Sequence, residues 1–172
     1  MTLFKNNCVI ACLAYLLTII GFLALTAGFF TPFWNVSTQT DGSKTFSGLI
    51  MTCNTNFSCS FDIAQIEKFS KADFSGIQVG SMTLGIAGWV FGLVTLIIVM
   101  IYSCFPITVT GVLAIIGAII SGVTGVACVI MYGKGILTIS EAAVSWSLGL
   151  YTGGSALMIL VAIVLIINVC VM

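Results

Sequence analysis

The stretch that decides the fold is Trp34–Cys59, WNVSTQTDGSKTFSGLIMTCNTNFSC. It belongs to the one long segment of mixed polarity before residue 75, and long apolar runs lie on both sides of that segment. It contains Trp34, the step Gly48-Leu49-Ile50, and the cysteines Cys53 and Cys59. A polar segment between such runs predicts a water-exposed loop between membrane-spanning helices.

The composition of the whole chain agrees with a membrane environment. Of the 172 residues, 60% are hydrophobic and 6% are charged, whereas about a quarter of the residues in a soluble domain are charged. So much apolar surface cannot be hidden in one water-soluble core. The net charge is zero and there is no His. We therefore expect no nucleic-acid binding, no enzyme activity, no cofactor and no metal site.

Four uncharged apolar runs predict four membrane-spanning helices, at about residues 8–30, 79–101, 107–131 and 148–171. Each run is long enough to cross a hydrocarbon core of about 30 Å at about 1.5 Å per residue. Pro32 is expected to close the first helix. The predicted outer loops are 31–78 and 132–147. The chain is therefore expected to form a single four-span domain, residues 1–172, with both termini on the same side of the membrane.

The long loop is expected to fold in water. It holds seven of the ten charged residues, namely Asp41, Lys44, Asp62, Glu67, Lys68, Lys71 and Asp73. Each would cost about 2.5–3.5 kcal/mol at the centre of a membrane. Residues 46–53 and 57–61 are strand-like runs with a turn at 54–56, and 63–69 has the three-residue apolar spacing of a short helix. The loop therefore predicts a small twisted sheet followed by a helix.

Cys53 and Cys59 are the only two of the seven cysteines in the long loop. Their spacing suits a disulfide bond across a hairpin, which would stabilise the loop by about 2 kcal/mol in the chain-entropy model. A redox or metal-binding role is the alternative, although it would require closer spacing or further ligands. A disulfide bond would place this loop outside the cytosol.

The lysines oppose that orientation. Four of the five, Lys44, Lys68, Lys71 and Lys134, lie on the loop side of the predicted spans, and the positive-inside rule alone would make that side cytoplasmic. Two N-glycosylation acceptor motifs, at Asn35 and Asn56, agree with the cysteines instead. Asn56 lies at the predicted hairpin tip, whereas Asn35 lies close to the end of the first span, where a membrane-bound enzyme has little access. We follow the cysteines and acceptor motifs, and expect cytoplasmic termini.

The pattern of Trp34, then Gly48-Leu49-Ile50, then Cys53 and Cys59, followed by three more apolar spans, resembles the claudin superfamily. This group includes the claudins, the peripheral-myelin and epithelial-membrane proteins, and the calcium-channel gamma and AMPA-receptor accessory subunits. The family pattern has a second tryptophan where this chain has Ile50. The resemblance implies a mainly α membrane protein, with a four-helix bundle and a small disulfide-stapled extracellular β-sheet.

The resemblance also implies two functions. In the first, the sheet binds copies of itself or related four-span proteins, giving cell–cell junction or adhesion contacts and a paracellular barrier at the plasma membrane. In the second, the protein is an accessory subunit that docks laterally on an ion channel or receptor. We favour the first, because residues 48–53 closely follow the claudin form of the loop. The candidate contact residues are Asp41, Lys44, Asp62, Lys134 and Glu141.

Three further patterns concern the spans. Cys104 and Cys170, at the cytoplasmic ends of predicted spans, are candidates for palmitoylation, with inert cysteines as the alternative. Small residues recur at four-residue spacing, at Gly88, Gly92, Gly117, Ser121, Gly125, Gly149 and Gly153. We expect them to pack the bundle rather than form a dimerisation face. Four aromatic residues fit an interfacial belt, Tyr102, Phe105, Tyr132 and Trp146.

Overall fold

The structure is a computed structural model that describes residues 2–38, 43–56, 58–61, 77–137 and 143–171. The described elements, in chain order, are α1 (Thr2–Phe30), β1 (Asn35–Thr38), β2 (Lys44–Ser47), β3 (Met51–Asn54), β4 (Cys59–Phe61), α3 (Ile77–Cys104), α4 (Thr108–Leu137), β5 (Ala143–Val144) and α5 (Trp146–Val171). All four helices contain a segment long and apolar enough to cross a membrane. The predicted four-span layout is confirmed in this respect, and we treat the chain as a membrane protein.

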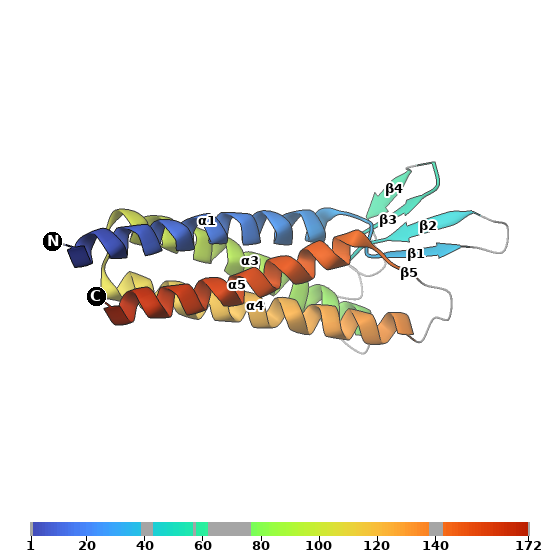
Figure 1. Cartoon of the computed structure of the whole chain (residues 1–172). Helices are drawn as coiled ribbons and strands as arrows, with labels where there is room; N and C mark the ends of the chain where they lie inside the picture. The colour runs from blue at the N-terminus through green and yellow to red at the C-terminus, as the bar shows by residue number, and fades with distance from the viewer. Residues whose placement is uncertain (1, 39–42, 57, 62–76, 138–142, 172) are drawn as a thin grey trace.

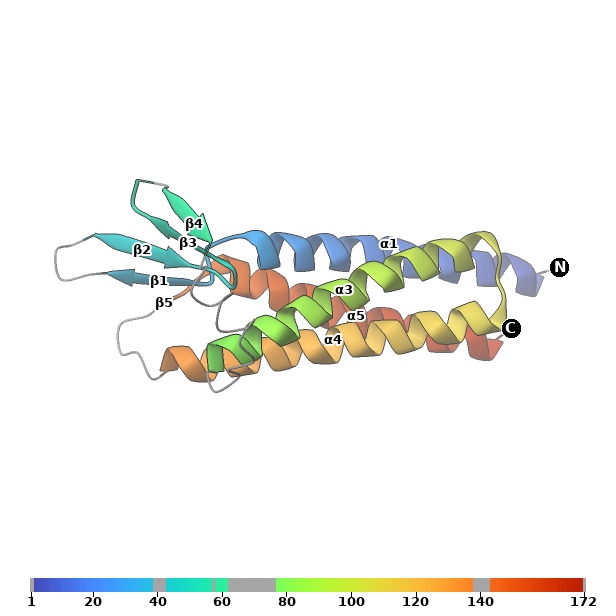
Figure 2. The same cartoon turned by 180° about the vertical axis from the view of Figure 1, so that it is seen from behind.

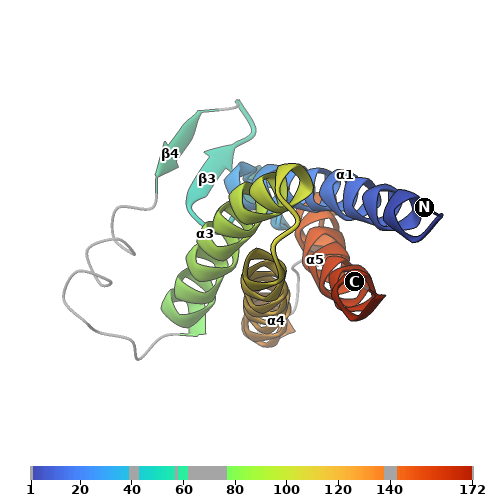
Figure 3. The same ribbon diagram turned by 90° about the vertical axis from the view of Figure 1, so that its left-hand side faces the viewer.

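The four helices form an elongated bundle in which each helix packs against two others. The packed pairs are α1 with α5, α5 with α4, α4 with α3, and α3 with α1, so α3 and α5 lie diagonally opposite (Figure 3). Figure 1 shows both chain termini at one end of the bundle and the sheet at the other. We call these the termini end and the sheet end. Pro106 lies in the short connection between α3 and α4. Because proline has no backbone N–H to donate, it breaks the helical hydrogen-bond pattern at this point.

Small residues bring the helices close together, as predicted for most of them. A Cβ added to Gly92 would lie 3.2 Å from the Ser121 hydroxyl oxygen. The backbone nitrogen of Gly125 is likewise 3.3 Å from the Cβ position of Gly88. These contacts lie between α3 and α4, where close backbone approach replaces the hydrophobic effect as the source of cohesion in lipid. Gly149 and Gly153 differ, because nothing lies within 4 Å of a Cβ at either position.

Some buried hydroxyl groups in the bundle donate to a carbonyl oxygen of their own helix. Thr18 donates to the carbonyl of Ala14 at 2.7 Å, and Ser155 donates to that of Tyr151 at 2.8 Å. Bonds of this kind to the carbonyl four residues earlier let a hydroxyl enter an apolar interior without losing a partner. The buried amide of Asn168 is different, because its Nδ2 donates to the Tyr102 hydroxyl at 3.1 Å while its Oδ1 is buried without a partner.

The strands form one antiparallel sheet in the order β4-β3-β2-β1-β5, and it continues beyond the sheet end of the bundle (Figures 1 and 2). The long loop supplies β1 to β4, so the predicted small sheet in this loop is confirmed, although β1 was not predicted. The predicted single strand 46–53 is wrong, because the chain turns at Gly48 and makes two strands, β2 and β3. The fifth strand comes from the segment before α5, where Val144 pairs with Asn35. That pairing was not predicted.

Three other predictions need correction or fall outside the described residues. The predicted loop 132–147 is too long, because α4 continues to Leu137 and α5 begins at Trp146. Tyr102 and Tyr132 are buried rather than interfacial, since their rings point into the bundle, whereas Phe105 and Trp146 are exposed as expected. The predicted helix 63–69 lies outside the described residues.

Candidate functional site

Trp34 fixes the base of the sheet in the bundle. Its side chain is fully buried, and its indole nitrogen donates a hydrogen bond to the carbonyl oxygen of Gly28, in the last turns of α1. The ring packs edge-on against Tyr132 of α4, with centroids 4.9 Å apart, and against Tyr151 of α5 at 5.2 Å. One side chain therefore joins the start of the sheet to three helices.

The turn between β2 and β3 inserts a second side chain. The Gly48 nitrogen donates to the Met51 carbonyl at 2.7 Å, which closes the turn and points Leu49 into the bundle. Leu49 is 3% exposed, and its tip contacts Gly85 of α3, where no side chain occupies the space. Ile50 packs against the same cluster and is only partly buried. We call Trp34, Gly48, Leu49 and the residues that they contact in the helices the seat of the sheet.

Gly48 is needed at this turn for steric reasons. A Cβ at position 48 would lie 2.6 Å from the carbonyl oxygen of Thr31 and 2.8 Å from the Cα of Pro32. Both are backbone atoms, which cannot move aside as the end of a flexible side chain can. The turn therefore lies directly against the chain that leaves α1, and a larger residue would push the two segments apart.

The start of α5 is tied to the same base. The Ser145 nitrogen donates to the Trp34 carbonyl at 3.1 Å, and the Thr31 hydroxyl donates to the Ser147 hydroxyl at 2.8 Å. The Tyr151 hydroxyl donates a hydrogen bond across the bundle to the carbonyl oxygen of Gly85 in α3, at 2.9 Å. These bonds join segments far apart in the chain, so the sheet and the bundle form one connected unit.

The predicted disulfide bond between Cys53 and Cys59 is present. The two residues are directly opposite each other on β3 and β4, in the same register as Met51 with Phe61. The bond closes the outermost described hairpin, whose strand β4 is exposed at all three of its residues. A three-residue edge strand has little packing of its own, so the covalent link is the main constraint on its position.

Pairing across the sheet places different chemistry on its two faces. Paired residues point to the same face, and alternate residues along a strand point to opposite faces. On strands β1 to β4, one face therefore carries only hydroxyl and amide side chains, which we call the hydroxyl–amide face: Asn35, Ser37, Thr45, Ser47, Thr52, Asn54 and Ser60. The opposite face carries Val36, Phe46, Met51, Phe61 and the disulfide bond.

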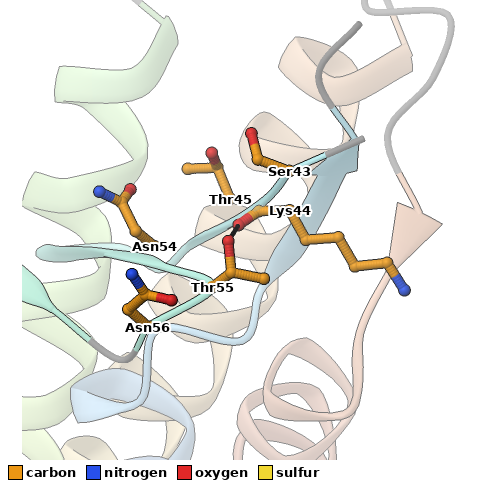
Figure 4. Close-up of a pocket in the computed structure, with 6 residues that line it drawn as sticks. All are labelled: Ser43, Lys44, Thr45, Asn54, Thr55 and Asn56. Carbon is orange, nitrogen blue, oxygen red and sulfur yellow. Dashed lines mark hydrogen bonds between the residues drawn. The ribbon is translucent and has the colours of Figure 1, made fainter. Parts of the chain in front are cut away.

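A polar pocket of about 260 Å³ lies beside the hydroxyl–amide face (Figure 4). It is lined by Ser43, Lys44, Thr45, Asn54, Thr55 and Asn56. The Thr55 hydroxyl donates to the Lys44 carbonyl at 3.4 Å, which links the two rims of the pocket. The Lys44 side chain extends away from the other five residues, so its ammonium group is not directed into the pocket (Figure 4).

The structure brings the motif residues together, and of the five predicted contact residues it describes only Lys44 and Lys134. Lys44 is exposed on β2 and Lys134 is exposed near the end of α4, at the same end of the bundle. Asp41, Asp62 and Glu141 lie outside the described residues. At the termini end, Cys104 and Cys170 are both exposed. Asn35 lies inside the sheet, and Asn56 is exposed in the turn after β3.

Three residues of the site were not predicted from the sequence, namely Tyr132, Tyr151 and Gly85. They lie far along the chain from the loop, and nothing in their local sequence signals a contact with it. A scan against protein-family models matched no family, and a search of curated proteins found no relative. The resemblance to claudins therefore rests on the loop residues alone, and membership of that family stays a prediction.

Proposed function

We propose that the chain is a plasma-membrane adhesion protein whose sheet forms cell–cell contacts and a paracellular barrier. In this proposal the sheet end is extracellular and both termini are cytoplasmic. The disulfide bond supports that orientation, because such bonds persist in oxidising compartments. The proposed partners are copies of the chain, or related four-span proteins, in the same and in the opposite membrane.

The observation that carries this proposal is the rigid mounting of the sheet beyond the membrane-spanning segments. Trp34 and Leu49 fix its base, and the strands continue away from the bundle (Figures 1 and 2). A binding surface that is already ordered before contact loses less conformational entropy on association. A sheet directed away from the helices is suited to contacts with an opposing surface rather than with the lipid around it.

The surface of the sheet favours a barrier over an ion-selective pore. Among its described strand residues, Lys44 is the only charged one. Uncharged hydroxyl and amide groups give little electrostatic focusing of ions. We therefore expect contacts between copies to limit ion flow with little charge preference.

Cells in suspension provide the test. Cells that express the chain should concentrate it where two expressing cells touch, and should leave it diffuse where an expressing cell touches a non-expressing one. Cys53→Ser, which releases the outer hairpin, should abolish the enrichment in whatever fraction reaches the surface. Cys12→Ser, at an exposed cysteine of α1, is the matched control and should retain it. Diffuse staining of the unaltered chain at doubly expressing contacts would refute the adhesion proposal.

A second function, lateral docking on an ion channel or receptor, is favoured by one observation on α5. Gly149 and Gly153 are exposed, lie one helical turn apart, and leave space beside the helix. Such a face permits close approach of another membrane helix. Gly153→Leu should then release a stoichiometrically co-purifying channel or receptor while leaving contact enrichment unchanged. If enrichment is absent and this release is observed, the accessory function replaces adhesion.

Cys104 and Cys170 fit the same orientation. Both are exposed at the termini end, which is cytoplasmic in this proposal, and cysteines at such membrane edges are common palmitoylation sites. We propose that one or both carry a thioester-linked acyl chain. Hydroxylamine-dependent labelling should detect it and should disappear in the Cys104→Ser, Cys170→Ser double variant.

A further inference from the structure

The two glycosylation motifs occupy very different places in the fold. Asn35 opens β1, which is an inner strand hydrogen-bonded to β2 on one side and to β5 on the other. Its Oδ1 is buried without a partner. Asn35 also follows the end of α1 at Phe30 by only five residues (35 − 30 = 5), a reach of at most about 18 Å for an extended chain. A sugar at Asn35 would meet both the sheet and the membrane.

Asn56 has neither restriction. It is exposed in the turn between β3 and β4, together with Thr55 and Ser58. The turn is closed by a hydrogen bond from the Asn54 nitrogen to the Ser58 carbonyl, 3.1 Å long, which does not involve the Asn56 side chain. The side-chain amide of Asn56 is therefore accessible while the strands on either side are already paired.

Asn56 also borders a surface with the chemistry of a sugar site. It lines the polar pocket, and Thr45 and Asn54 of the hydroxyl–amide face line the same pocket (Figure 4). Hydroxyl and amide groups can both donate and accept hydrogen bonds, as the hydroxyl and acetamide groups of N-acetylglucosamine do. Among the described residues, the pocket lining contains no carboxylate, and the Lys44 side chain extends away from the pocket. The pocket thus matches a neutral sugar attached at its own rim.

We propose that Asn56, and not Asn35, carries an N-linked glycan, and that its first N-acetylglucosamine lies in the pocket beside the hydroxyl–amide face. The donor is a polyprenyl-pyrophosphate-linked oligosaccharide. The bond between C1 of the sugar and the phosphate oxygen breaks, a bond from C1 to Asn56 Nδ2 forms, Nδ2 loses one proton, and polyprenyl pyrophosphate leaves. The proposal rests on the extracellular orientation of the sheet proposed above, but not on the adhesion function.

Expression in mammalian cells tests the attachment site. The unaltered chain should lose one glycan on treatment with peptide-N-glycosidase F. Asn56→Gln and Ser58→Ala should each abolish the mobility shift. Asn35→Gln and Ser37→Ala, the matched changes in the other motif, should leave it unchanged. A shift that persists in Asn56→Gln, or is lost in Asn35→Gln, overturns the assignment.

A reporter motif separates failure of the site from failure of the orientation. An acceptor peptide fused to the N-terminus should remain unmodified while Asn56 is glycosylated. Modification of the reporter with no glycan on Asn56 would overturn the proposed orientation, and with it this proposal. If neither is modified, the assignment of Asn56 is wrong although the orientation stands.

Hydrogen exchange tests the position of the first sugar. Endoglycosidase H trims a high-mannose glycan to a single N-acetylglucosamine, and this form is compared with Asn56→Gln. Amides of residues 43–47 and 52–56 should exchange about fivefold more slowly in the trimmed form, the effect of about one added hydrogen bond. Thr45→Val, in the pocket, should remove the difference. Thr38→Val, on the opposite face, should not. Equal exchange in the trimmed form and in Asn56→Gln would overturn the placement of the sugar.

Discussion

Leu49→Ala is the most direct test of how the sheet is held. Leu49 is 3% exposed, and its tip contacts Gly85 of α3. The sulfur atom of Cys128 lies beside the same glycine, 3.3 Å from the position of an added Cβ. Removing a buried leucine side chain costs about 2–5 kcal/mol, through lost burial and the cavity left behind. The variant should therefore favour states in which the sheet has left its seat and Cys128 is uncovered.

The rate at which Cys128 reacts with a small thiol reagent measures that opening. The experiment uses a chain in which the other four cysteines outside the disulfide bond are replaced by serine, namely Cys8, Cys12, Cys104 and Cys170. When opening and closing are fast relative to labelling, the rate follows the population of the open state. A loss of 2 kcal/mol corresponds to an increase in rate of about 30-fold.

Leu23→Ala is the matched control. Leu23 lies on α1 and is 60% exposed, on the outer surface of the bundle, so its truncation leaves no internal cavity. Its effect on Cys128 labelling should stay within about twofold, as expected for a surface substitution of up to about 0.5 kcal/mol. If Leu49→Ala and Leu23→Ala label at the same rate while both chains remain folded, Leu49 does not hold the sheet in the bundle.

Three further substitutions test other parts of the same unit. Gly48→Ala should lower stability in a thermal-shift assay by about 1–3 kcal/mol, because the new methyl group meets fixed backbone. Gly149→Ala, where nothing lies within 4 Å of the added Cβ, should not lower it, and an equal loss in the two variants would contradict the steric argument. Tyr151→Phe keeps the ring but removes its bond to α3, so a loss of about 0.6 kcal/mol is expected; a loss of several kcal/mol would show a different role. Cys53→Ser should cost about 2 kcal/mol and reduce surface delivery relative to Cys12→Ser; normal delivery would count against the disulfide bond as a structural requirement.

The features that could be predicted from sequence are those recorded in local, continuous patterns. An apolar run of more than 20 residues is a strong signal because the bilayer requires every residue of the span to tolerate hydrocarbon. All four runs became helices, with ends that moved by a few residues. The disulfide bond was predictable for a similar reason, since Cys53 and Cys59 were the only pair in the long loop.

The features that could not be predicted depend on contacts between distant segments. β5 is two residues long and becomes a strand only because β1 lies beside it. The run 46–53 reads as one strand by composition, yet Gly48 makes a turn there, since the backbone that follows α1 occupies the space. Tyr132 resembles an interfacial residue in sequence, but it lies against the buried ring of Trp34. In each case tertiary packing decided between local alternatives.

Position 50 shows which parts of the loop pattern the fold constrains. The family that the sequence resembles has tryptophan at this place, and this chain has Ile50. In the structure Trp34 and Leu49 enter the bundle, and Gly48 has no space for a side chain. Ile50 packs only at the margin of the same cluster and remains partly exposed. A marginal position requires apolar contact rather than one particular shape. Isoleucine at position 50 is therefore compatible with an intact seat, whereas changes at 34, 48 or 49 would alter the contacts that form it.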